Sequence, residues 1–151
     1  MSYEGIFKIK EITLEECDEM LDLWESSVRA THDFLTEEDI NSLKPLVRSG
    51  LLEMQYVICM KEDNGMIKGF MGIIRNKIEM LFVKDKFMGS GIGKLLITYA
   101  IDKLNARYVD VNEQNKKAVG FYTHLGFKEF SKSKVDSQGN PFPILHMKLG
   151  K

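Results

Sequence analysis

The stretch Met88-Gly89-Ser90-Gly91-Ile92-Gly93-Lys94 decides how the rest of the sequence is interpreted. It separates a run typical of a β-strand, 77–83, from a run with helical spacing of apolar residues, 92–104. Glycines allow unusual backbone dihedrals and let a ligand approach the main chain closely. The N-terminus of a helix presents free N–H groups and a partial positive charge. The stretch therefore predicts an anion-binding site, and a pyrophosphate would suit it.

Two well-known phosphate motifs do not match the spacing. A dinucleotide fingerprint needs glycine at its first, third and sixth positions, but the sixth position counted from Gly89 is Lys94. A P-loop ending in Gly93-Lys94 would need glycine in place of Met88 and a hydroxyl residue in place of Leu95. On the loop alone, a glycine-rich turn without a ligand remains an alternative.

Lysines surround this loop in a chain that is slightly acidic overall. Lys84 and Lys86 precede it, Lys94 closes it, and Lys116 and Lys117 open the next predicted helix. Such a basic neighbourhood is compatible with phosphate binding. A solvated lysine face is the alternative interpretation.

Hydrophobic periodicity sorts the remainder of the chain into strands and helices. Thr13 and Glu16 form a capping-box pair at the start of the first helix, and Asp63-Asn64-Gly65 predicts the tight turn of a β-hairpin. Pro45 is expected to kink or split the second helix. The predicted strands cover 6–12, 54–60, 66–74, 77–83, 108–111, 127–135 and 143–149, and the predicted helices cover 13–30, 36–50, 92–104 and 118–125.

This order of elements predicts an α/β (α+β) fold in which a mixed sheet is flanked by helices. In the strand 77–83, alternation places Ile78, Met80 and Phe82 on one face and the intervening residues Glu79, Leu81 and Val83 on the other. With 151 residues, of which 44% are hydrophobic, the chain is expected to form a single domain, 1–151.

Composition narrows the classes of partner and location. A net charge of -1 with 28% charged residues of both signs gives no reason to expect nucleic acid or a membrane as partner. The chain has no long apolar run and no pattern of a secretory signal, so we expect it in the cytoplasm. Cys17 and Cys59 lack metal or disulfide spacing. His32, His124 and His146 are far apart in the chain, and no metal is expected.

Two motifs together resemble the GNAT N-acetyltransferase superfamily. Leu81-x-Val83 followed by the glycine loop resembles the coenzyme A pyrophosphate motif, in which Arg or Gln precedes the spaced glycines. Asn115-x-x-Ala118-x-x-Phe121-Tyr122-x-x-x-Gly126-Phe127 resembles the second motif of the family. The motifs span 78–127, and the order of the elements outside them also fits. Within the superfamily, 30–35 and 111–115 resemble the YjaB-like branch of bacterial acetyltransferases.

The resemblance implies a GNAT fold, with a mixed and mostly antiparallel sheet of about seven strands flanked by about four helices. It also implies transfer of an acetyl group from acetyl-CoA to a primary amine, by direct attack within a ternary complex. One departure stands out, because Met88 occupies the Arg or Gln position. That departure favours the alternative function, a catalytically silent sensor or interaction module that binds coenzyme A.

The resemblance assigns coenzyme contacts to both motifs. The Val83 N–H would polarise the thioester carbonyl, while the side chains of Leu81 and Val83 would belong to the core. Asn115 is interpreted equally well as a helix cap and as a contact to the coenzyme. The full set of expected coenzyme-binding residues is Leu81, Phe82, Val83, Met88, Gly89, Ser90, Gly91, Ile92, Gly93, Lys94, Asn115, Ala118, Phe121 and Tyr122.

The resemblance also suggests the catalytic residues. Tyr122 matches the family's tyrosine and is expected to protonate the departing thiolate. Glu79 is the first candidate for the general base and His32 the second, with solvent as the alternative to both. The acceptor site is expected at the segments 29–35 and 136–144, and a homodimer is left open. The expected acceptor contacts are Arg29, His32, Asp33, Phe34 and Asp136.

Overall fold

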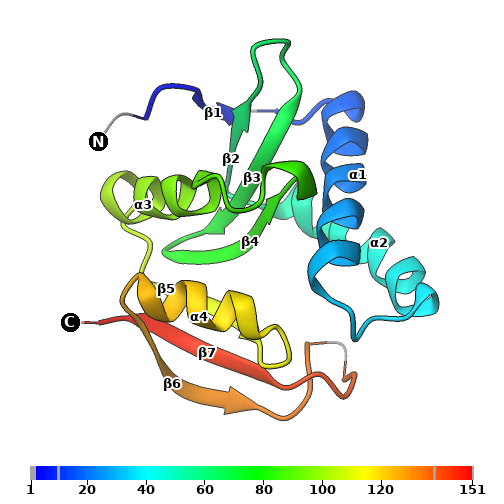
Figure 1. Ribbon diagram of the computed structural model, residues 1–151, viewed down its shortest axis with the longest axis vertical. Helices are drawn as coiled ribbons and strands as arrows, with labels where there is room; N and C mark the ends of the chain where they lie inside the picture. Colours follow the sequence, from blue (N-terminus) through cyan, green and yellow to red (C-terminus); the bar gives the residue numbers. More distant parts are fainter. Residues whose placement is uncertain (1–2, 10, 138, 151) are drawn as a thin grey trace.

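The computed structural model describes residues 3–9, 11–137 and 139–150. Two layers of helices enclose a twisted sheet (Figure 1). In chain order the elements are β1 Ile6–Ile9, α1 Leu14–Thr31, α2 Glu37–Glu53, β2 Tyr56–Lys61, β3 Ile67–Ile74, β4 Lys77–Val83, the 3-10 turn η1 Asp85–Phe87, α3 Ile92–Leu104, β5 Tyr108–Asn112, α4 Lys116–His124, β6 Phe127–Ser133 and β7 Ile144–Leu149.

The strands form a seven-stranded sheet in the order β1-β2-β3-β4-β5-β7-β6. Neighbouring strands are antiparallel, except that β4 and β5 run parallel. Helix α3 provides the crossover that a parallel pair requires. The predicted mixed, mostly antiparallel sheet of about seven strands flanked by about four helices is confirmed.

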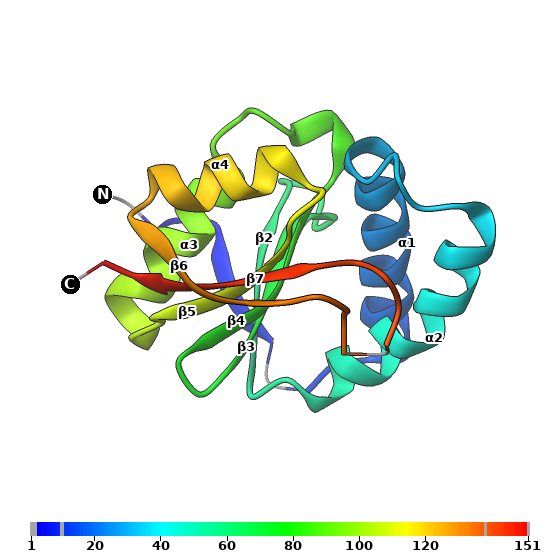
Figure 2. The same cartoon turned by 90° about the horizontal axis from the view of Figure 1, so that it is seen from below.

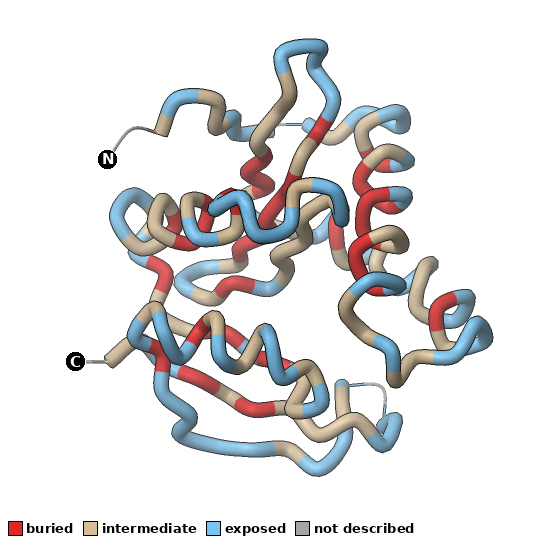
Figure 3. The backbone as a smooth tube through the Cα atoms, viewed as in Figure 1, coloured by how far each residue is buried: buried red, intermediate tan, exposed pale blue. Residues whose placement is uncertain are grey.

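The core has one hydrophobic cluster on each face of the sheet. Helices α3 and α4 cover one face, where Leu96 and Ile97 of α3 pack with Met71 and Ile73 of β3. Helices α1 and α2 cover the other, where Trp24 of α1 is among the buried side chains. Figure 2 shows the two helical layers on opposite sides of the central strands, and Figure 3 shows that buried residues concentrate on those strands and on the inner face of α1.

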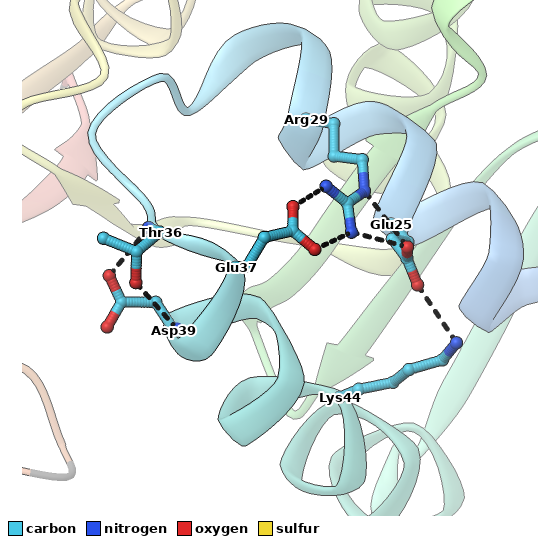
Figure 4. Close-up of polar contacts among 6 residues, drawn as sticks. All are labelled: Glu25, Arg29, Thr36, Glu37, Asp39 and Lys44. Atoms are coloured by element: carbon cyan, nitrogen blue, oxygen red, sulfur yellow. Dashed lines mark hydrogen bonds and ion pairs between the residues drawn. The ribbon is translucent and has the colours of Figure 1, made fainter.

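Ion pairs hold helix α2 to the end of α1, and a capping box stabilises the start of α2 (Figure 4). Thr36 and Asp39 form a reciprocal capping box at its start. Arg29 of α1 donates to Glu37 of α2 and, at 3.0 Å, to Glu25 of its own helix. Helix α2 runs without interruption from Glu37 to Glu53, so the predicted split at Pro45 is wrong.

Strand β4 departs from simple alternation at one residue. Gly72 of β3 pairs with Met80, but the next residue, Ile73, pairs with Ile78. Glu79 is therefore the extra residue of a β-bulge. As a result, Ile78 shares the α3–α4 face with Leu81 instead of lying with Met80, and the predicted assignment of faces is wrong at this end of the strand.

The remaining differences concern the limits of elements. Strand β1 ends at Ile9, β6 ends at Ser133, and β7 begins at Ile144. Two predicted positions, Lys10 in the first strand and Gln138 in the last loop, lie outside the described residues. Among the described helices, none combines the length and the apolar character needed to cross a bilayer.

Candidate active site

The two parallel strands at the centre of the sheet part shortly after they meet. Pairing between β4 and β5 is limited to Lys77 with Tyr108 and Ile78 with Val109. The bulge at Glu79 follows immediately on β4. Beyond this point the two strands leave backbone groups that no longer pair across the gap, which is where an extended ligand can pair instead.

A hollow of about 130 Å³ lies at this divergence. It brings together seven of the residues expected from the sequence: His32, Glu79, Leu81, Phe82, Asn115, Ala118 and Tyr122. The other residues that line it are Ile78, Met80, Val109, Asp110, Val111 and Asn112. A larger hollow of about 280 Å³ lies elsewhere, between β1, the end of α2 and β2, but its lining includes none of the expected site residues.

The glycine loop forms an open cradle at the start of α3. Gly89 and Gly91 have φ of 82° and 90°, in the left-handed region that favours glycine. A Cβ at either position would meet nothing within 4 Å, so the loop surface is open. Gly91 is the N-cap of α3 and offers no side-chain acceptor, so the first N–H groups of the helix are available to a ligand. This arrangement fits a pyrophosphate.

Close packing holds this cradle against α4. A Cβ on Gly93 would lie 3.4 Å from Cζ of Phe121 and 3.8 Å from Cγ2 of Val83. Gly93 is thus at the contact between the first turn of α3, the end of β4 and the ring of Phe121. The loop and the hollow are therefore fixed relative to each other through the same three elements.

Tyr122 forms part of the inner wall of the hollow. Its side chain is buried, with 7% of the residue exposed. Its ring makes edge-on contacts with Phe121 and Phe127, at centroid distances of 5.0 and 5.7 Å. Burial raises the pKa of the phenol well above its usual value, so the hydroxyl keeps its proton at neutral pH.

A chain of hydrogen bonds crosses the hollow from α1 to α4. His32 Nδ1 lies 2.7 Å from Oγ1 of Thr31, and its Nε2 lies 3.3 Å from Nδ2 of Asn115. Oδ1 of Asn115 accepts from the N–H of Ala118 and caps α4. Burial lowers the pKa of His32, against the smaller opposite effect of Asp33, and this favours the neutral imidazole.

A second polar row, absent from the expectations, runs across the sheet beside the hollow. Asp110 of β5 accepts from Nζ of Lys77 at 2.7 Å and lies 2.7 Å from Nδ1 of His146. Nε2 of His146 lies 2.7 Å from Oγ of Ser133, and Nζ of Lys77 lies 3.8 Å from Glu79. Partial burial lowers the pKa of Lys77, but the hydrogen bond and charge of Asp110, with Glu79, outweigh it and raise the pKa. An acidic residue at position 110, between Val109 and Val111, was the available sequence signal.

The expected acceptor residues are distributed over several sites. Phe34 packs against His32 and Phe142, at centroid distances of 5.3 and 5.8 Å, close to the hollow. Asp33 is exposed in the same loop. Arg29 is engaged by two glutamates at the α1–α2 junction, and Asp136 accepts from the N–H and side chain of Asn140 in the β6–β7 connection. None of these four lines the hollow.

The chain is similar to a known protein family and to individual members of it. Residues 33–150 match the family pattern of the acetyltransferase (GNAT) domain. The chain belongs to the GNAT acetyltransferase family. It is 37% identical over 142 residues to the peptidyl-lysine N-acetyltransferase YjaB of Escherichia coli strain K12, covering 94% of this chain and 96% of that protein. It is also 30% identical over 120 residues to the peptidyl-lysine N-acetyltransferase YiaC of the same strain, covering 79% and 82%.

Solved structures agree with this membership. The solution structure of apo YjaB from Escherichia coli has a TM-score of 0.83 at 35% identity and covers 97% of this chain and 99% of that one. The PaiA N-acetyltransferase of Thermoplasma acidophilum, solved in complex with coenzyme A, shares the fold, with a TM-score of 0.67 at 22% identity over 98% of this chain and 99% of that one.

The chain is therefore an N-acetyltransferase that moves an acetyl group from acetyl-CoA to an amine. The predicted family, its YjaB-like branch, the cofactor and the class of reaction are confirmed. The cradle at Gly89–Lys94 fits the pyrophosphate of this cofactor, and the hollow adjoins it through Gly93 and Val83. In the ranges 3–9, 11–137 and 139–150, no group of three or more metal-ligating side chains is arranged to hold a metal ion.

The cradle can be tested by placing a charge in it. Ser90 is exposed in the loop. We expect Ser90→Glu to weaken coenzyme A binding about tenfold at low salt, because a carboxylate would repel the pyrophosphate. The matched variant Ser90→Gln has the same size without the charge and should bind within about twofold of the unaltered protein. Calorimetric titration with coenzyme A measures both; equal affinities for the two variants would contradict the assignment.

Proposed function

We propose that this GNAT acetyltransferase acetylates the ε-amino group of lysine in peptides or proteins. Two relatives that share 37% and 30% identity with it are peptidyl-lysine N-acetyltransferases. The observation that carries the proposal is the hollow between β4 and β5. It combines a buried phenol, a neutral imidazole and two carboxylates within one set of lining residues.

Backbone groups are proposed to hold the cofactor. The N–H groups at Gly89, Gly91 and the first turn of α3 would receive the pyrophosphate, and the edge of β4 at Leu81 and Val83 would receive the extended arm. When bound, acetyl-CoA supplies an acetyl group activated as a thioester. Met88 would leave these backbone contacts intact, because its own side chain is exposed beside the loop.

Tyr122 is proposed to act as the general acid. A thiolate becomes a good leaving group when a nearby acid protonates it. The high pKa of the phenol ensures that a proton is present on Tyr122 at neutral pH. Its ring contacts Phe121, and Phe121 packs against Gly93 of the cradle that would hold the cofactor, which supports this role.

Glu79 and His32 are the two proposed bases. Both line the hollow, and they come from different elements, since Glu79 is the bulged residue of β4 and His32 caps the end of α1. Free Cys17 and Cys59 are both buried in the core, which supports direct transfer to the amine over a covalent cysteine intermediate. Reduced thiols are also compatible with the proposed cytoplasmic location.

The charges at the hollow suit a cationic acceptor. Glu79 and Asp110 both line it, and Lys77 balances one of these two carboxylates. The remaining negative charge would attract a lysine ammonium and discourage an acidic acceptor.

The acceptor class is tested with a matched pair of peptides. One has a blocked α-amine and a single lysine, and the other has a free α-amine and norleucine in place of that lysine. We expect saturable release of coenzyme A thiol with the first peptide and a kcat/KM at least about tenfold higher than with the second, because the carboxylates select a long cationic side chain. Acetylation of the α-amine alone, or of neither peptide, would contradict the proposal.

Removing the phenolic hydroxyl tests the acid. We expect Tyr122→Phe to lower kcat by about 100-fold or more while coenzyme A affinity stays the same, because the variant keeps the ring and loses the proton donor. Tyr99→Phe, the same change on α3 outside the hollow, is the control and should retain full turnover. An undiminished kcat in Tyr122→Phe would exclude the acid role.

A further inference from the structure

The hydrogen bonds around His32 fix which ring nitrogen carries its proton. On one side, Oγ1 of Thr31 lies 2.8 Å from the carbonyl oxygen of Ser27, four residues earlier in α1. A carbonyl can only accept, so the Thr31 hydroxyl donates its hydrogen there, as threonines in helices commonly do. The hydroxyl oxygen then faces Nδ1 of His32 at 2.7 Å with a lone pair, and Nδ1 must carry a hydrogen to bond with it.

The contact on the other side of the ring requires the same tautomer. Oδ1 of Asn115 accepts from the N–H of Ala118, which orients the side-chain amide. The NH₂ group of Asn115 consequently faces Nε2 of His32 at 3.3 Å. A hydrogen on Nε2 would face the N–H donors of Asn115, and no hydrogen bond could form. Nε2 therefore presents a lone pair. The opposite tautomer would lose both hydrogen bonds, a bias of about tenfold or more.

We propose that Thr31 and Asn115 are positioning residues that hold His32 in its Nδ1–H form, so that Nε2 accepts the proton lost by the acceptor amine. This inference rests on the proposed function. It goes further by choosing His32 over Glu79 as the base and by assigning a role to Thr31. Glu79 instead faces the ammonium of Lys77 at 3.8 Å and contributes to the charge that attracts the acceptor.

The proton balance is simple. The bound lysine ammonium first loses one proton to water, the neutral amine then attacks, and a second proton leaves its nitrogen as the new C–N bond forms. An N–H bond breaks, an Nε2–H bond forms, and the imidazole becomes an imidazolium that later releases the proton to water, while Tyr122, having protonated the thiolate, regains its proton from water. An alkyl ammonium has a pKa about four units above that of an imidazole, so equilibrium transfer of the first proton to His32 would be disfavoured about ten-thousand-fold. The nitrogen becomes acidic enough to protonate Nε2 only as it bonds to the carbonyl carbon. Transfer therefore accompanies the attack.

The hydrogen bond between Asn115 and His32 is the one that breaks when the acceptor amine binds. At 3.3 Å it is the longest in a series whose other members measure 2.7, 2.8 and 3.1 Å. The amine can replace the Asn115 NH₂ at Nε2 without disturbing the Thr31 contact or the cap on α4. The ring thus keeps its orientation and tautomer while its lone pair changes partner.

The test combines a spectroscopic readout with turnover. In a long-range ¹H–¹⁵N correlation spectrum of the full-length protein labelled at histidine, the ring signals absent from His32→Gln identify His32. We expect them to show the Nδ1–H tautomer. Thr31→Val keeps the shape but loses the hydroxyl, and should shift the tautomer ratio towards Nε2–H and lower kcat, each about fivefold, with the KM for acetyl-CoA unchanged. Thr31→Ser keeps the hydroxyl and should restore both.

An Nε2–H tautomer in the unaltered protein would overturn the inference. So would an unchanged spectrum or an unchanged kcat in Thr31→Val, or equal losses in Thr31→Val and Thr31→Ser. The spectrum needs no acceptor, and kcat can be measured with whichever amine is acetylated. Failure of the lysine assignment is therefore distinguishable, because the tautomer and its dependence on Thr31 would persist.

Discussion

The parting of β4 and β5 is the constraint on which the site depends. The two strands run parallel, yet they pair only at Lys77–Tyr108 and Ile78–Val109. The bulge at Glu79 shifts the alternation of side chains along β4 at the point where its pairing with β5 stops. A sheet with full pairing at its centre would have no hollow there. We propose that a thioester and an amine meet at this open edge, inside an otherwise closed core.

The two sides of that opening are supported by different parts of the chain. Helices α3 and α4 supply the cradle and the phenol, and the contact of Gly93 with Phe121 joins them. The end of α1 supplies His32, whose loop is braced by the pairing of Arg29 with glutamates at the α1–α2 junction. The hydrogen bond between His32 and Asn115 joins the end of α1 to the start of α4. Asn115 therefore both caps α4 and contacts the imidazole of His32.

Local sequence patterns were sufficient for the features that depend on local structure. Glycine spacing, capping residues and periodicity predicted the loop, the helix α4 and the order of elements, because turns and helix ends are determined by neighbours in the chain. These patterns could not predict on which face of the sheet Ile78 lies, because a bulge depends on the register of β4 with β3. The row from Lys77 through Asp110 to His146 was missed for the same reason. The bond between His32 and Asn115 joins residues 83 positions apart, which no local pattern indicates.

Backbone amide shifts, mapped as coenzyme A is added to the protein, test most directly whether the glycine loop and β4 hold the cofactor. The largest changes are expected at Gly89–Lys94 and along β4 at Leu81–Val83, with little change around Leu51 and Val57 at the larger hollow. Changes centred on that second hollow, or a glycine loop that does not respond to saturating coenzyme A, would contradict this placement of the cofactor.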